Sequence, residues 1–264
     1  MRPFIALVTL LAVGLPATGR AQDSTLTTRW AWRVPDGRWI NVRNLNGRVD
    51  VHQGSGDSVV VTATKRVYRG DASYVSYAVQ RYGDGDQDVL VCALWGSNAD
   101  CSPTGYDSDR DDRDSRRNRI SVTFDVAVPA GVRVSAHTVN EGVSVTGATS
   151  EVVAGTVNGG VTVETDGGPV SASTVNGSVH VTMLHYQPTR DMRFSSVNGS
   201  VVVEFGGNID ADIDLQTVNG RFVSDFPVTL NGRIDPRHLR ATLGKGGPTI
   251  RIRTVNGNVE LRKH

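Results

Sequence analysis

The sequence predicts an all-β fold, a β-solenoid (β-helix) with coils of 18–22 residues and Asn-Gly corners. One observation is the phrase Thr-Val-Asn-Gly, which returns along the C-terminal half of the chain with small variations. A second is the alternation of apolar and polar residues on both sides of each copy, the pattern of a half-buried strand. A third is the spacing of the asparagines from Asn140 to Asn256, which advances by 18, 18, 22, 21 and 37 residues. Each repeat is therefore expected to be a strand, a corner and a second strand.

An asparagine marks the corner of every repeat. Its seven positions are Asn46, Asn140, Asn158, Asn176, Asn198, Asn219 and Asn256. Asn and Gly both tolerate a positive φ, so the pair lets the backbone turn sharply between two strands. If the repeats stack, these asparagines form a column in which side-chain amides can bond in a ladder. We interpret the apolar residue before each asparagine as a side chain that points inward at the corner.

Two architectures satisfy this pattern. In an antiparallel meander barrel or sandwich, Asn-Gly would form a two-residue hairpin turn. In a solenoid, each strand pairs in parallel with its equivalent in the neighbouring coil. The solenoid is favoured because the apolar residue before Asn breaks the hairpin alternation, because identical residues recur in columns, and because length varies only at the far corner, as at residues 184–191.

The first 21 residues predict a secretory signal peptide with cleavage after Ala21. Arg2 precedes the apolar run from Phe4 to Leu15, and small residues flank the expected cut. The run is too short to span a bilayer comfortably, and no other segment approaches about 20 apolar residues. We therefore expect an exported protein, periplasmic, surface-located or secreted, with no transmembrane segment in the mature chain.

The N-terminal half contains three tryptophans and several further strands. Trp30, Trp32 and Trp39 are expected to cover the end of the stack, with an aromatic ligand platform as the alternative. Alternating segments predict strands at 58–67, 73–81, 89–93 and 120–128.

Two irregular segments interrupt this pattern. Residues 94–119 carry a run of mixed charges and predict a solvated loop inserted into a single solenoid domain, residues 22–264. The alternative is a linker between a small N-terminal sandwich and the solenoid. Residues 225–249, rich in Pro and Gly, are interpreted as a degenerate coil.

The two cysteines, Cys92 and Cys101, are nine residues apart and can close a loop in an oxidising compartment, which predicts a disulfide, with two free thiols as the alternative. Their neighbourhood offers too few ligands for a metal site. Residues 84–88 and 107–111 alternate acids like the start of a calcium loop but lack its Gly and Glu, so they predict solvated turns. No cofactor is expected.

Charge and acidic residues limit the functions that fit. Lys plus Arg number 28 and Asp plus Glu 27, so no strong net field exists to recruit nucleic acid. Asp210, Asp212 and Asp214 alternate with apolar residues and are predicted to share the outward face of one strand, where they could bind a cation or raise one another's pKa. No Lys, Arg or His on that strand completes an acid–base set, so we predict no catalytic site.

The repeated phrase, the alternating valines after it and the run Gly246 to Ile250 before the last copy resemble the bacterial DUF4097 "putative adhesin" family over roughly residues 40–262. The resemblance implies an exported β-helical domain and supplies no functional residues. The leading hypothesis is a non-enzymatic, adhesin-like surface for cell-surface polymers or envelope proteins. The alternatives are a glycan lyase or hydrolase centred on the three aspartates, and an envelope element that self-associates end to end.

Overall fold

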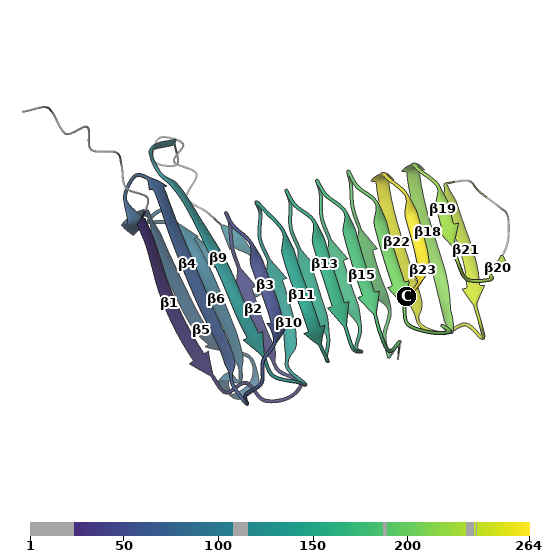
Figure 1. Cartoon of the computed structure of the whole chain (residues 1–264), viewed down its shortest axis with the longest axis horizontal. Helices are drawn as coiled ribbons and strands as arrows, with labels where there is room; N and C mark the ends of the chain where they lie inside the picture. Colours follow the sequence, from purple (N-terminus) through teal and green to yellow (C-terminus); the bar gives the residue numbers. More distant parts are fainter. Residues whose placement is uncertain (1–23, 108–115, 187–188, 231–234, 236) are drawn as a thin grey trace, which may run out of the picture.

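The structure is a computed structural model that describes residues 24–107, 116–186, 189–230, 235 and 237–264. The predicted signal peptide lies outside the described residues, as do the middle of the charged loop and most of the acidic run 107–111. The described chain is an elongated stack of strands (Figure 1). Two short 3-10 turns, η1 (Ala72–Tyr74) and η2 (Asp84–Asp86), are among its few helical residues. No helix in the described part of the chain is long and apolar enough to cross a membrane.

Two large sheets contain nearly all the strands. In the described residues the first sheet has ten strands, in the order β1-β4-β9-β3-β11-β13-β15-β17-β23-β19. These are β1 (Ser24–Trp32), β3 (Val49–Gln53), β4 (Val59–Arg69), β9 (Arg119–Val128), β11 (Val143–Ala148), β13 (Val161–Thr165), β15 (Val179–Met183), β17 (Val201–Phe205), β19 (Phe222–Ser224) and β23 (Val259–Lys263).

The second sheet has eleven described strands, in the order β20-β21-β18-β22-β16-β14-β12-β10-β2-β6-β5. These are β2 (Trp39–Arg43), β5 (Val75–Tyr82), β6 (Asp88–Trp95), β10 (Arg133–His137), β12 (Val152–Gly155), β14 (Val170–Ser173), β16 (Met192–Ser195), β18 (Ala211–Asn219), β20 (Thr229–Leu230), β21 (His238–Leu243) and β22 (Thr249–Asn256). A small hairpin, β7 (Asp100–Cys101) with β8 (Tyr106–Asp107), forms a third, two-stranded sheet.

The two strands of each repeat lie in different sheets. The strand before the asparagine belongs to the second sheet and the strand after it to the first, and each pairs in parallel with its equivalent in the next repeat. Val143 pairs with Val161, and Val161 with Val179. The Asn-Gly corners therefore join two sheets, so the alternative of hairpin turns in an antiparallel meander is wrong for these strands.

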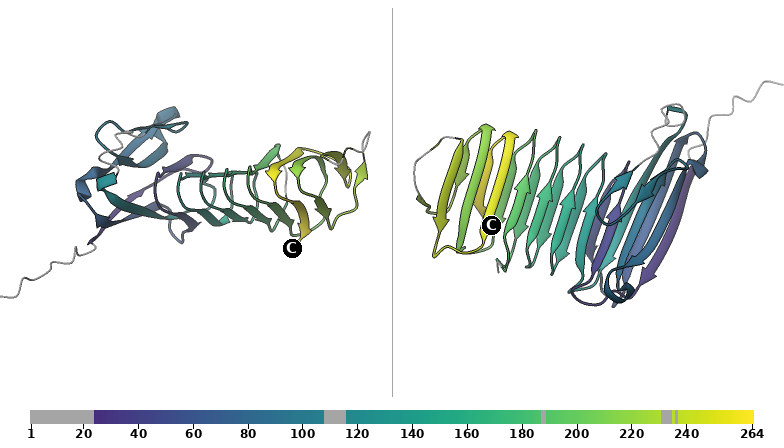
Figure 2. Two further views of the ribbon diagram at one scale, coloured as in Figure 1. Left: turned by 90° about the horizontal axis from the view of Figure 1, so that it is seen from above. Right: turned by 180° about the vertical axis from the view of Figure 1, so that it is seen from behind.

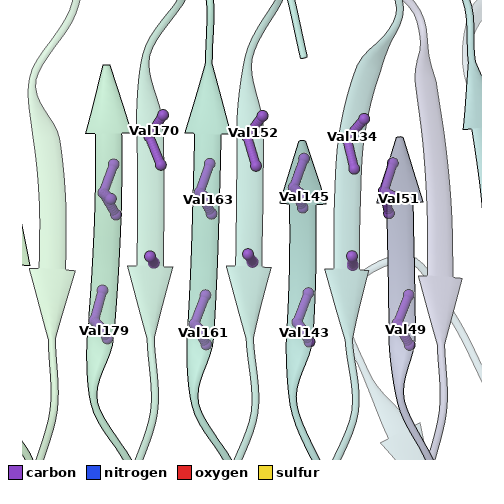
Figure 3. Close-up of a cluster of buried hydrophobic side chains, with 14 of the residues drawn as sticks. Val49, Val51, Val134, Val143, Val145, Val152, Val161, Val163, Val170 and Val179 are labelled. Atoms are coloured by element: carbon purple, nitrogen blue, oxygen red, sulfur yellow. The ribbon is translucent and has the colours of Figure 1, made fainter. Parts of the chain in front are cut away.

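The interior lies between the two sheets. Alternate side chains of each strand point inward, and Figure 3 shows the resulting rows, Val143, Val145, Val161 and Val163 from one sheet facing Val134 and Val152 from the other. Val161 and Val163 are fully buried. The buried side chains form one cluster that runs from Val34 to Leu261. Period-two alternation in the sequence thus produces a single continuous core.

Repeats do not stack in the order of the chain. The first repeat, β2 and β3, pairs directly with β10 and β11, so the long segment between Asn46 and Asn140 extends the end of the stack. The last repeat, β22 and β23, inserts between the repeat of β16 and β17 and that of β18 and β19. Figure 2 shows the repeats following one another along the long axis of the molecule.

The N-terminal end of the stack is built from antiparallel strands. β1 pairs with β4 and β4 with β9 in the first sheet, and β5 pairs with β6 in the second. Aromatic rings meet between the two sheets here. The ring centroid of Trp30 lies 5.2 Å from that of Tyr77, which lies 6.3 Å from that of Phe124. Trp32 stacks on Trp30, whereas Trp39 lies at the start of β2 beside Arg133.

Residues 225–249 do not form the expected degenerate coil. β20 pairs antiparallel with β21, and β21 pairs antiparallel with β18, so this segment extends the second sheet as a meander. Asp225 and Pro227 stand where other repeats place apolar residues, and a further parallel coil would have to bury them.

The threonine of each phrase, and not the residue after it, points inward. Val157, Val175 and Val197 are 38–39% exposed, so the expectation that the residue before Asn faces the core is wrong. Thr174 is only 5% exposed, and its Oγ1 donates a hydrogen bond of 2.8 Å to the carbonyl oxygen of Gly159 in the neighbouring repeat. The hydroxyls of Thr138, Thr156, Ser196, Thr217 and Thr254 donate in the same way to a residue just after a neighbouring asparagine. A buried hydroxyl needs such a partner, and the stack supplies one at every repeat.

The asparagines form a ladder on the outside of the corner. Asn176 Nδ2 donates to Asn158 Oδ1 and Asn198 Nδ2 donates to Asn176 Oδ1, each over 2.9 Å. The same bond links the other neighbours as far as Asn219, in the order Asn140, Asn158, Asn176, Asn198, Asn256, Asn219. Asn46 instead donates to the carbonyl of Ile120, 2.6 Å away.

Where a glycine follows the corner asparagine, close packing against the neighbouring strands requires it. A Cβ on Gly177 would lie 2.0 Å from the carbonyl oxygen of Gly159. Among the described residues other than glycine, only Asp86 and Glu141 have a positive φ. The corner asparagines therefore turn without the left-handed conformation that we expected of them.

Candidate functional site

The outer face of the second sheet is the candidate functional site. The outward side chains of β14, β16 and β22 alternate with buried ones, and they align in two columns across the strands. Ser171 pairs with Arg193, which pairs with Arg251. In the second column Ser173 pairs with Ser195, which pairs with Arg253. Serines therefore stand beside a closely spaced group of arginines.

Two grooves of about 360 Å³ each are present on this face. The serine groove has a floor that includes Val153, Ser171, Ser173 and Ser195, with Asp191, Arg193 and Arg251 also lining it. The histidine groove is lined by Gln216, Arg237, His238 and Arg253 together with the corner residues Val218 and Val255. Each groove thus combines neutral hydrogen-bonding groups with arginine side chains.

The arginines of the face are incompletely neutralised. Among the described residues, no carboxylate forms an ion pair with Arg193 or Arg253. Arg251 Nε lies 3.6 Å from Asp214 Oδ2, and this buried nitrogen makes no hydrogen bond in the described structure. Asp191, which also lines the serine groove, accepts a hydrogen bond of 2.8 Å from the backbone N–H of Thr249. The face is therefore suited to an anionic ligand.

The three aspartates predicted on one strand take three different partners. Asp210 lies just before β18 and accepts a hydrogen bond of 2.8 Å from the backbone N–H of Lys245. Asp212 accepts one of 2.9 Å from Thr242 Oγ1. Asp214 Oδ1 lies 2.8 Å from His238 Nε2, and Asp214 also pairs with Arg251. The three carboxylates are thus held separately.

Asp214 has basic neighbours that the sequence pattern of its own strand does not indicate. They come from other strands, His238 from β21 and Arg251 from β22, which flank β18 on its two sides. Burial raises the pKa of Asp214, but the hydrogen bond with His238 and the charges of His238 and Arg240 outweigh this and hold it below its usual value. In the sequence, His238 and Arg251 appear only as polar residues that alternate with apolar ones on two separate strands, so nothing local links them to Asp214.

A disulfide-linked hairpin lies at the N-terminal end of the face. Cys92 on β6, the strand next to the terminal strand of the second sheet, is bonded to Cys101 on β7. The hairpin of β7 and β8 is held by Tyr106, whose OH donates to the carbonyl of Ala93 over 2.9 Å, and by Arg43, which donates to the carbonyl of Pro103. Part of the predicted solvated loop is therefore ordered against the sheet, and β6 itself extends to Trp95.

His137 lies close to this covered end, on β10. Burial lowers its pKa to about 4, and the charge of Arg43 acts in the same direction. Among the described residues, no group of three His, Cys, Asp or Glu side chains could hold a metal ion.

Of the two calcium-like segments, Asp84–Asp86 forms the turn η2, and Asp88 accepts a hydrogen bond of 2.7 Å from the backbone N–H of Trp39.

No known family model matches the chain, and no curated protein matches it. A "putative cell adhesion protein" from Clostridium sporogenes has a similar structure, with 9% sequence identity and a TM-score of 0.51 over 92% of this chain and 100% of that one. The likeness is one of fold. A "putative adhesin" from Bacteroides fragilis covers 90% of this chain and 97% of its own at 9% identity, but its TM-score of 0.31 is too low to support a shared fold. Membership of the DUF4097 family stays a prediction.

Proposed function

We propose that this chain is an exported, non-enzymatic β-solenoid that binds cell-surface polymers or envelope proteins through the outer face of its second sheet. The observation that carries the proposal is the pair of grooves on that face. Two of the arginines that line them, Arg193 and Arg253, form no ion pair with a described carboxylate. The parallel pairing of successive repeats supports the solenoid. The similar fold of the Clostridium sporogenes protein, described as a "putative cell adhesion protein", supports an adhesin-like role.

Export and domain organisation belong to the same proposal. The Cys92–Cys101 bond is typical of a protein that folds in an oxidising compartment, which agrees with the predicted signal peptide. The continuous core between the two sheets supports a single domain over residues 22–264. The corner asparagines then have a structural role, since their side chains bond to one another.

End-to-end assembly is less well supported. At three of the four sheet ends, the terminal strand pairs antiparallel with its neighbour: β1 with β4, β5 with β6, and β20 with β21. The parallel pairing of the repeats therefore stops before these sheet ends, which present antiparallel edge strands to a second copy. We therefore do not propose a filament.

The test is binding of the chain from residue 22 onward to intact cells and isolated envelope fractions, with one variant that fills the serine groove. In Ser171→Trp a large ring occupies the groove floor. The matched control is Thr162→Trp, which places the same ring on the outer face of the first sheet. We expect Ser171→Trp to abolish binding and Thr162→Trp to retain it. Equal binding by both variants, or no binding of the wild-type chain to any fraction, would overturn the proposal.

Glycan cleavage is a second candidate, because of one contact. Asp214 and His238 form a close carboxylate–imidazole pair, and His238 lines the histidine groove. Such a pair can act in general acid–base catalysis. The check is to incubate the protein with any polymer it binds and to measure new chain ends. Product that is formed by the wild type and lost in Asp214→Asn would favour the enzyme over the adhesin.

A further inference from the structure

We infer that the ligand of this face is an anionic polysaccharide, a polymer with carboxylate or sulfate groups, that lies across the strands from β12 to β22. The inference rests on the proposed function and specifies its ligand class. It follows from the placement of arginines, from the floor of the serine groove and from the contrast between the two sheets.

The arginine columns place like charges side by side. Arg193 and Arg251 are direct partners on adjacent parallel strands, which lie about 4.8 Å apart. Like charges in such cross-strand positions are destabilising, and arginine does not lose its proton to relieve the repulsion. Asp214 neutralises Arg251, but no described carboxylate pairs with Arg193. A ligand anion between these side chains would supply the missing negative charge.

The floor of the serine groove fits a sugar chain. Ser171, Ser173 and Ser195 are small and carry hydroxyls that both donate and accept hydrogen bonds, so a polymer can approach the sheet closely. The strand spacing is close to the length of one sugar residue, which allows successive sugars to meet equivalent columns. No aromatic side chain lines either groove in the described residues, and base stacking is a main source of single-strand nucleic-acid affinity. The observations therefore favour a polysaccharide over a nucleic acid.

Along the repeat strands β3 to β23, the outer face of the first sheet carries several carboxylates. Its outward side chains include Asp50, Glu164, Glu204 and Glu260, while Arg262 is paired with Glu260 and Asp225. An anionic polymer would be repelled there and attracted to the second sheet.

The experiment uses the chain from residue 22 onward and three soluble probes: alginate, which carries carboxylates, dextran sulfate, and neutral dextran. Arg193→Ser and Arg253→Ser introduce the residue that the paired strand already has in each column, so the fold should tolerate them. The control is Arg66→Ser on β4, an exposed arginine whose partner on β9 is Ser121. Dissociation constants are measured by calorimetry at low and high salt.

We expect alginate or dextran sulfate to bind and dextran not to bind, with the stronger of the two identifying the preferred anionic group. Each groove substitution should weaken binding about tenfold or more, the usual effect of losing a charge-assisted hydrogen bond, and Arg66→Ser should leave it unchanged. Salt should weaken binding by the wild type.

Equal binding of dextran, or full affinity in the Arg193→Ser and Arg253→Ser double variant, would overturn the anionic ligand. The proposed function would then still stand if Ser171→Trp abolishes binding to envelope fractions. Double-stranded DNA bound more tightly than either charged polysaccharide would also overturn the inference. If the wild-type chain binds no polysaccharide and no envelope fraction, both proposals fail.

Discussion

Replacing Thr174 with valine should destabilise the stack, although valine has the same shape as threonine. Thr174 is 5% exposed, and its hydroxyl donates a 2.8 Å hydrogen bond to the carbonyl of Gly159. Valine removes this donor, so the carbonyl oxygen of Gly159 loses its hydrogen-bond partner. Leaving such a group unsatisfied costs about 1–3 kcal/mol. Burial of the methyl group that replaces the hydroxyl stabilises the fold by about 0.8 kcal/mol at most. We therefore expect the free energy of unfolding to fall by about 1–2 kcal/mol.

Urea denaturation followed by circular dichroism measures this change, with two control variants. Thr174→Ser keeps the hydroxyl and places the residue that Ser196 already provides in the same column, so it should cost less than valine. Thr162→Val makes the same substitution on the exposed outer face of the first sheet, where it should change stability by less than about 0.5 kcal/mol. A Thr174→Val variant as stable as the wild type would refute the role of the hydroxyl ladder.

Three further predictions concern the corner, the core and the covered end of the second sheet. Asn176→Ala and Asn176→Gly should each lose about 1–2 kcal/mol in urea denaturation, because both remove the amide bonds to the two neighbouring asparagines; a glycine variant as stable as the wild type would contradict the ladder. Val161→Asp buries a carboxylate at a position with no exposed surface, and it should cost about 3 kcal/mol or more, seen as a large fall in melting temperature. His137 has a folded pKa of about 4, below its ordinary value near 6.5, so the stability it contributes is present above pH 6.5 and is lost as the pH falls towards 4. This amounts to about 3 kcal/mol, and a His137→Gln variant should show a flatter dependence of the urea midpoint on pH over that window.

The repeated phrase predicted strands and core positions correctly where residues close in the sequence determine them. Alternation around each asparagine specified the strands that β10 to β17 form, and it placed Val161 and Val163 in the interior. Strands at β4, β5, β6 and β9 were also expected within one to two residues of their observed bounds. The direction of Val157 and Val175 was predicted wrongly, because the corner orients its side chains by the hydrogen bond of the threonine and not by hydrophobicity.

Stack order and the composition of the candidate face depended on tertiary structure. The pairing of β22 between β16 and β18 unites Arg251 with Arg193 on one side and Asp214 on the other, although these residues are far apart in the chain. The antiparallel return of β21 brings His238 to Asp214. Parallel pairing needs only matching apolar columns, and several repeats offer the same columns, so the sequence alone left their neighbours undetermined.

The sequence by itself determined an all-β chain of strand–corner–strand repeats with a buried valine face, because period-two alternation depends only on nearby residues. Which polar residues meet on the outer face was decided by the order in which the repeats pack.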